Sequence, residues 1–123
     1  MAYLSIFLGG FLGTIARYSI GKKVGQFWQK PFPLGTLIIN MSGSFIIGFL
    51  FTFFAVRNNI AQTVQIGMTT GFTGAYTTFS AFSYEALKLI EDREGLYLLM
   101  YIGSSLLAAL LMVHLGIVVA NLI

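Results

Sequence analysis

Four long apolar segments occupy almost the whole chain, at residues 3–20, 34–56, 62–84 and 96–123. Each is long enough to cross the hydrocarbon core of a bilayer, which takes about 20 helical residues. Of the 123 residues, 57% are hydrophobic and only 9% are charged, a balance that a soluble domain of this size could not carry on its surface. The sequence therefore predicts an all-α membrane protein with one four-helix transmembrane domain, residues 1–123.

The third segment differs in composition from a helix that faces lipid. Twelve of the seventeen residues from 67 to 83 are Gly, Ala, Ser or Thr. A lipid-facing helix gains nothing from so many hydroxyls and loses rigidity with each glycine. We therefore expect this segment to be buried against other protein and broken near residues 74–78. Broken helices at membrane depth usually line a pathway.

The few charged residues lie near the ends of the segments and indicate a topology. An interfacial loop is expected at 21–33, where two prolines and a tryptophan accompany three lysines. This side of the membrane carries five basic residues and the other side carries Arg57; the five are Lys22, Lys23, Lys30, Lys88 and Arg93. The positive-inside rule then places both termini outside. So few basic groups in short loops indicate contact with the lipid bilayer and no nucleic-acid partner.

Small and polar residues recur at helical spacing on two of the segments. On the first, an interval of four joins Ser5, Gly9, Gly13, Arg17 and Gly21, a face that lets another helix approach closely. On the second, one face holds Thr36, Asn40, Gly43 or Ser44, and Gly48. An amide at membrane depth costs free energy unless it is hydrogen-bonded. Asn40 is thus either a contact between helices or a ligand for something polar.

The other two segments carry aromatic and hydroxyl side chains at similar spacing. On the fourth, Tyr97, Tyr101, Ser105 and Ala108 form a stripe. If the third helix restarts near Thr78, Phe79 and Phe82 share one face, and Ser80 and Ser83 lie on the neighbouring face. Such a phenylalanine pair is either plain packing or a pair of positive ring edges that face an anion.

At these residues the sequence resembles the Fluc fluoride channel family, also called CrcB proteins. The resemblance covers nearly the whole chain and rests on three motifs in order. They are Gly9-Gly10-x-x-Gly13-x-x-x-Arg17-Tyr18, then Pro33-x-Gly35-Thr36-Leu37-x-x-Asn40-x-x-Gly43-x-Phe45-x-x-Gly48, and Thr70-Gly71-Phe72 followed by Thr77-Thr78-Phe79-Ser80-x-Phe82-Ser83-x-Glu85. Each motif alone is weak, but three in order at this length are specific.

The resemblance implies a passive, fluoride-selective channel in the cell membrane that exports fluoride and confers fluoride resistance. It implies an antiparallel, dual-topology dimer with pathways at the protomer interface and a structural sodium ion at its centre. The pathway residues are then expected to be Asn40, Phe79, Phe82, Ser80, Thr36, Tyr101 and Ser105. Gly74 and Thr77 match the residues whose backbone carbonyls would hold sodium.

Other functions fit the sequence less well. A proton-coupled small multidrug-type exporter also has four short spans, but it is expected to carry an acidic residue in its first helix, where this chain has only Arg17. An enzyme is not expected, because no nucleophile and base pair or metal constellation is present. The unequal charge of the loops leaves two partners open: a second copy of the chain, or an oppositely oriented paralogue.

Overall fold

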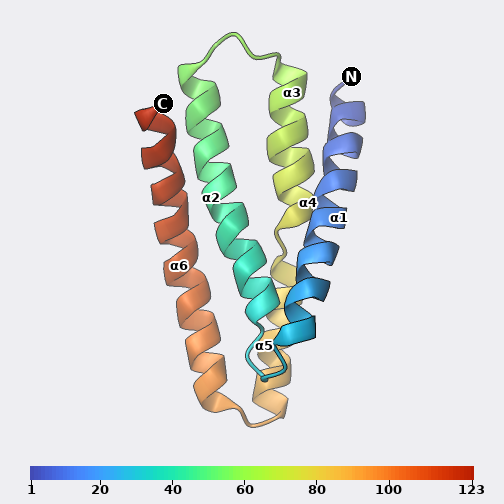
Figure 1. Ribbon diagram of the computed structural model, residues 1–123, viewed down its shortest axis with the longest axis vertical. Helices are drawn as coiled ribbons and strands as arrows, with labels where there is room; N and C mark the ends of the chain where they lie inside the picture. Colours follow the sequence, from blue (N-terminus) through green and yellow to red (C-terminus); the bar gives the residue numbers. More distant parts are fainter.

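The computed structural model describes all 123 residues and consists of helices joined by short connections (Figure 1). The elements are α1 (Ala2–Phe27), α2 (Leu34–Val56), α3 (Gln62–Ile66), the π-helix η1 (Gly67–Thr73), α4 (Gly74–Tyr76), α5 (Phe79–Glu91) and α6 (Gly95–Leu122). Three of them, α1, α2 and α6, are long and apolar enough to cross a membrane. The chain is therefore a multi-pass integral membrane protein. The predicted third span consists of α3, η1, α4 and α5 in succession.

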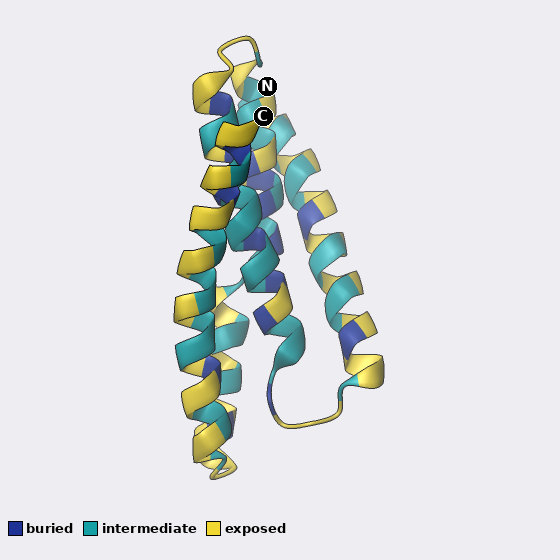
Figure 2. Ribbon diagram, turned by 60° about the vertical axis from the view of Figure 1, so that its left-hand side comes forward, coloured by how far each residue is buried: buried dark blue, intermediate teal, exposed yellow.

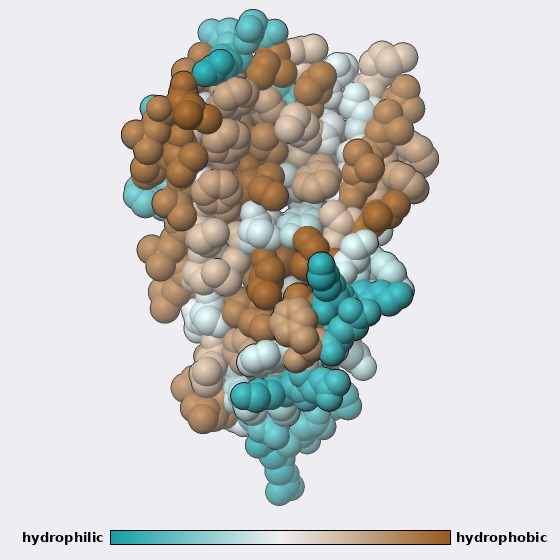
Figure 3. All heavy atoms as spheres, in the orientation of Figure 1, coloured by the Kyte–Doolittle hydropathy of each residue, from teal (hydrophilic) through white to brown (hydrophobic).

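The helices form four roughly parallel columns, as Figure 1 shows. α1 and the broken column run in one direction, and α2 and α6 run in the other. α2 packs along α6, and α1 packs along η1 and α4. Both termini and the connection after α2 lie at one end of the bundle, and the two remaining connections lie at the other. Apolar side chains cover the middle of the molecule and hydrophilic ones gather at its ends (Figure 3).

The loop predicted at 21–33 is shorter than expected, because α1 continues to Phe27. At about 1.5 Å per residue its 26 residues extend to about 39 Å, well beyond a hydrocarbon core of about 30 Å. The exposed Lys22 and Lys23 thus belong to the last turns of a helix that leaves the bilayer. Only residues 28–33 form the connection. There the Trp28 indole donates to the Phe32 carbonyl at 2.7 Å, and Lys30 lies 5.4 Å from the centroid of the Trp28 ring.

The break in the third column is confirmed and falls at Thr77 and Thr78. Thr77 has ψ 156° and Thr78 has φ −147°, so both are extended between α4 and α5. The Thr78 hydroxyl accepts the Ala81 N–H at 3.1 Å and caps the new helix. Before the break, the seven residues of η1 are π-helical, and the Thr73 hydroxyl donates to the Met68 carbonyl at 3.0 Å. The second half of the column extends to Glu91, further than the predicted limit at residue 84.

Glycines bring the backbones of neighbouring helices into contact. A Cβ atom at Gly9 would overlap the Gly67 carbonyl oxygen, and one at Gly13 would overlap the Phe72 carbonyl oxygen. The predicted close approach along the first helix is thus confirmed, and its partner is η1. Elsewhere few side chains are covered: 17 of the 123 residues are buried, mostly on inward helix faces (Figure 2). Most of the remaining surface faces lipid or another chain.

We predict that Gly9→Ala destabilises the fold by about 1–3 kcal/mol, because the backbone atoms opposite cannot yield without moving η1. Gly25→Ala on the same helix is the matched control, since a Cβ there meets nothing within 4 Å. Thermal unfolding in detergent measures both. Equal melting temperatures for the two variants would show that the contact between α1 and η1 does not constrain the fold.

Candidate functional site

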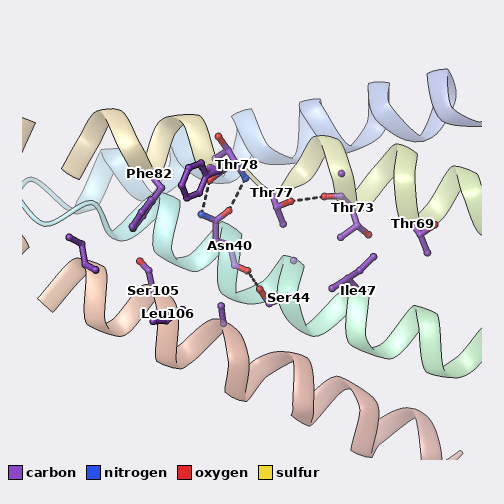
Figure 4. Close-up of a pocket in the computed structure, with 15 residues that line it drawn as sticks. Asn40, Ser44, Ile47, Thr69, Thr73, Thr77, Thr78, Phe82, Ser105 and Leu106 are labelled. Carbon is purple, nitrogen blue, oxygen red and sulfur yellow. Dashed lines mark hydrogen bonds between the residues drawn. The ribbon is translucent and has the colours of Figure 1, made fainter. Parts of the chain in front are cut away.

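A cavity of about 650 Å³ lies beside the break, between α2, the broken column and α6 (Figure 4). Its 15 lining residues include no charged side chain. The polar side chains among them are Asn40, Ser44, Thr69, Thr73, Thr77, Thr78 and Ser105. Apolar residues complete the wall, including Phe79, whose side chain is exposed. The cavity therefore opens at the side of the protomer and offers neutral dipoles and aromatic rings.

The Asn40 side chain binds both backbone groups of Thr78. Its Oδ1 accepts the Thr78 N–H at 2.8 Å, and its Nδ2 donates to the Thr78 carbonyl at 2.9 Å, as the dashed lines in Figure 4 show. Of the two roles that the sequence allows for this amide, a contact between helices is the one that the geometry shows. Nδ2 carries two hydrogens, so one donor remains for a ligand in the cavity.

The same contact releases backbone carbonyls on the amino-terminal side of the break. In a continuous helix the Thr78 N–H would bond to the Gly74 carbonyl, but here it bonds to Asn40. The Thr77 carbonyl accepts no hydrogen bond. Both residues border the cavity. Carbonyl oxygens of this kind are acceptors only, so they suit a cation and not an anion.

The hydroxyls that line the cavity differ in whether their hydrogen is already used in a hydrogen bond. Ser44 donates to the Asn40 carbonyl at 2.7 Å, Thr73 to Met68 at 3.0 Å and Thr77 to Thr73 at 3.0 Å. Each thereby uses its single hydrogen within its own helix and presents only lone pairs to the cavity. Ser105 on α6 lies across from Asn40 (Figure 4), and its hydroxyl makes no hydrogen bond within the chain. Donors are therefore free at the Asn40 amide and the Ser105 hydroxyl, while the Thr78 and Ser80 hydroxyls share a bond in which either can donate.

Two phenylalanine rings stand at the start of α5. The centroids of Phe79 and Phe82 are 5.7 Å apart, with 34° between the ring planes. Phe79 is 78% exposed, whereas Phe82 is half-buried and packs on Tyr101 at 5.1 Å. Both rings border the cavity, so the structure brings them together with Asn40 and Ser105. The Phe79 ring is thus on the surface of the chain, whereas the Phe82 ring is partly covered.

Three of the expected pathway residues lie outside the cavity lining. The Thr36 hydroxyl donates to the Glu85 carboxylate at 2.6 Å, and the fully buried Tyr101 donates to the same oxygen at 3.4 Å. Ser80 lies 3.2 Å from the Thr78 hydroxyl on the exposed side of the break. Thr36 and Tyr101 thus both bond to Glu85, for which the sequence suggested a place at a pathway mouth or a basic partner.

Thr73 and Thr78 are the main site residues that sequence reasoning did not single out. Thr78 is a recognisable helix cap, because a threonine directly before a new helical face is among the favoured N-cap residues. Thr73 borders the cavity as the last residue of the π-helix η1, and no residue spacing in the sequence indicated a π-helix.

Comparison with known proteins identifies the group to which this architecture belongs. The family model described as CrcB-like protein, Camphor Resistance (CrcB), matches residues 4–117. The chain belongs to the CrcB-like family. The match includes every helix that borders the cavity, so the broken column and its Asn40 contact lie within the shared region.

Members of the CrcB-like family with assigned names are similar over nearly their full length. The fluoride-specific ion channel FluC of Acidobacterium capsulatum is 41% identical over 98% of this chain and 97% of that protein. FluC 1 of Bacillus thuringiensis subsp. konkukian is 40% identical over 94% of this chain and 85% of its own length. FluC 2 of Moorella thermoacetica is 40% identical over 94% of this chain and 93% of its own length.

We predict that Asn40→Ala speeds hydrogen exchange at the Thr78 amide about tenfold, since a net hydrogen bond contributes on the order of 1 kcal/mol. The matched control is Ser44→Ala, one turn along the same helix, which removes only a bond to the Asn40 carbonyl. Exchange followed by mass spectrometry with fragment resolution reports both variants. An unchanged rate in Asn40→Ala would show that the amide does not hold the break.

Proposed function

We propose that this chain forms a passive, fluoride-selective channel in the cell membrane and acts in fluoride export and not as an enzyme. The support comes from two directions. The relatives that it matches over most of its length are named fluoride-specific ion channels. Independently, the cavity beside the break is polar without being charged.

The uncharged cavity is the observation that carries the proposal. Conduction needs sites that replace the water around an ion and still release it. The second hydrogen of the Asn40 amide and the Ser105 hydroxyl supply neutral donors, and the edges of the Phe79 and Phe82 rings carry partial positive charge. A lysine or arginine at this place would bind fluoride more strongly and slow its release. Ser80, Thr36 and Tyr101 belong to the same proposed pathway beyond the cavity lining.

A second protomer would complete the pathway. The cavity is open at the side where Phe79 is 78% exposed, so fluoride would meet lipid there unless another chain covers it. An antiparallel arrangement would place two such cavities at one interface. This dimer is a proposal that rests on the open side of the cavity and on the family resemblance.

The partner in this dimer is either a second copy or an oppositely oriented paralogue. The end of the bundle with connections 28–33 and 92–94 carries five of the seven basic residues. Such an imbalance favours one orientation of insertion. A paralogue therefore stays open as partner beside a second copy of the chain. Expression of this chain alone, followed by mapping of the exposed termini, decides between them: dimers that contain both orientations would contradict the need for a paralogue, and a single orientation without dimers would contradict the second copy.

A structural sodium ion fits the carbonyls at the break. Gly74 and Thr77 border the cavity with oxygens that α-helical bonding no longer uses. Hard oxygen donors suit a small cation, and two copies supply four of them. When bound, sodium would supply positive charge that offsets the clustered carbonyl dipoles.

If sodium binds at the break, its removal should destabilise the folded protein. Replacing sodium by N-methyl-D-glucamine at equal ionic strength should lower the melting temperature of the detergent-solubilised dimer, because a ligand of the folded state alone stabilises it. Potassium at the same concentration is the control for a general salt effect. Identical melting curves in all three salts would contradict the sodium site.

Substitution of the rings tests the channel directly. Phe79→Ile and Phe82→Ile should each slow fluoride efflux from liposomes about fivefold, because a ring-edge contact is worth on the order of 1 kcal/mol. Phe11→Ile is the control, since Phe11 is exposed on α1 and does not border the cavity. A fluoride-selective electrode records the efflux, and size-exclusion chromatography verifies the dimer. Normal efflux in both ring variants would remove the proposed role of the rings.

A further inference from the structure

Arg17 on α1 contacts the column next to the break, as Asn40 does from α2. Its Nε–H donates to the Ala75 carbonyl at 3.1 Å, between residues 58 positions apart in the sequence. Arg17 lies one turn beyond Gly13 on the glycine face of α1, where the two backbones touch. The close packing of α1 against η1 therefore sets how near the guanidinium comes to α4.

The Ala75 carbonyl needs such a donor. It belongs to the last turn of α4, and its helical partner would be the N–H of Phe79, which lies beyond the break in α5. A bare carbonyl at membrane depth costs free energy. A donor with positive charge at the carbonyl end of a helix is a favourable replacement.

The residues near the break therefore differ in their surroundings. Gly74 and Thr77 border the cavity, whereas Ala75 is not among the residues that line it and bonds towards α1 instead. We propose that Arg17 is a positioning residue for permeation: its Nε–H fixes the turn of α4 that presents Gly74 and Thr77 to the cavity. Arg17 thus holds Ala75 before the extended Thr77–Thr78 pair, and Asn40 holds Thr78 within it. The link to permeation rests on the proposed channel function.

We assign this role to the Nε–H donor of Arg17 and not to its positive charge. Two substitutions whose side chains have the same length separate the two. In Arg17→Gln the amide nitrogen occupies the position along the side chain that Nε occupies in arginine, so the donor stays and the charge is lost. In Arg17→Met a methyl group occupies that position, so both are lost. Lys22→Met, in an exposed position on the same helix, controls for loss of a basic residue.

Fluoride efflux and hydrogen exchange are measured on the full-length protein in each variant. We expect Arg17→Gln to stay within about twofold of the wild type, and Arg17→Met to lose about tenfold in efflux and to exchange the Thr78 amide, which is hydrogen-bonded to Asn40, about tenfold faster. Equal losses in both variants, or a loss in Arg17→Gln that shrinks at high ionic strength, would assign the role to charge and overturn the proposal. Wild-type exchange rates in Arg17→Met would overturn it as well.

Arg17→Gln tests whether the charge of Arg17 is needed even if Arg17→Met does not fold. The exchange measurement needs no fluoride transport, so it also decides between donor and charge if the chain proves not to be a channel. A failure of the proposed function is thereby distinguishable from a failure of this inference.

Discussion

The amide of Asn40 replaces the hydrogen bonds that the third membrane column loses at Thr78. In lipid, an unpaired N–H and carbonyl would be costly, and the column could avoid that cost by closing into a regular helix. Asn40 accepts from the one group and donates to the other, at 2.8 and 2.9 Å, so the extended form leaves neither Thr78 group unpaired. The free carbonyls before the break and the new helix start after it both depend on this extended backbone at Thr78.

Two further kinds of contact hold the two halves of the column in place around this point. On the amino-terminal side, Gly9 and Gly13 let α1 touch the backbone of η1. On the carboxyl-terminal side, the Thr78 hydroxyl caps α5 and so sets where Phe79 and Phe82 begin. The result is a cavity with carbonyl and hydroxyl acceptors on one part of its wall and with amide, hydroxyl and ring-edge donors on another. This wall contains no charged side chain.

Much of this arrangement could be predicted from the sequence because it depends on local composition. The apolar segments, the break, the glycine face and the shared face of Phe79 and Phe82 all follow from residue type and helical spacing. The end of α1 could not, because Lys22 and Lys23 occur equally in loops and in helices that leave the bilayer. Spacing also placed Thr36 and Tyr101 in line with cavity residues, but their contact with Glu85 joins three different columns. Only the tertiary structure determines such a contact.

The central claim is that neutral dipoles and ring edges at this break conduct fluoride without coupling to another ion. The most direct test uses liposomes loaded with potassium fluoride at neutral pH, containing the assembled protein and placed in a fluoride-free medium. We predict little efflux until valinomycin lets potassium leave, then rapid fluoride loss, with chloride retained in matched liposomes. Efflux that requires a proton gradient, equal loss of chloride, or no fluoride loss after valinomycin would contradict the account.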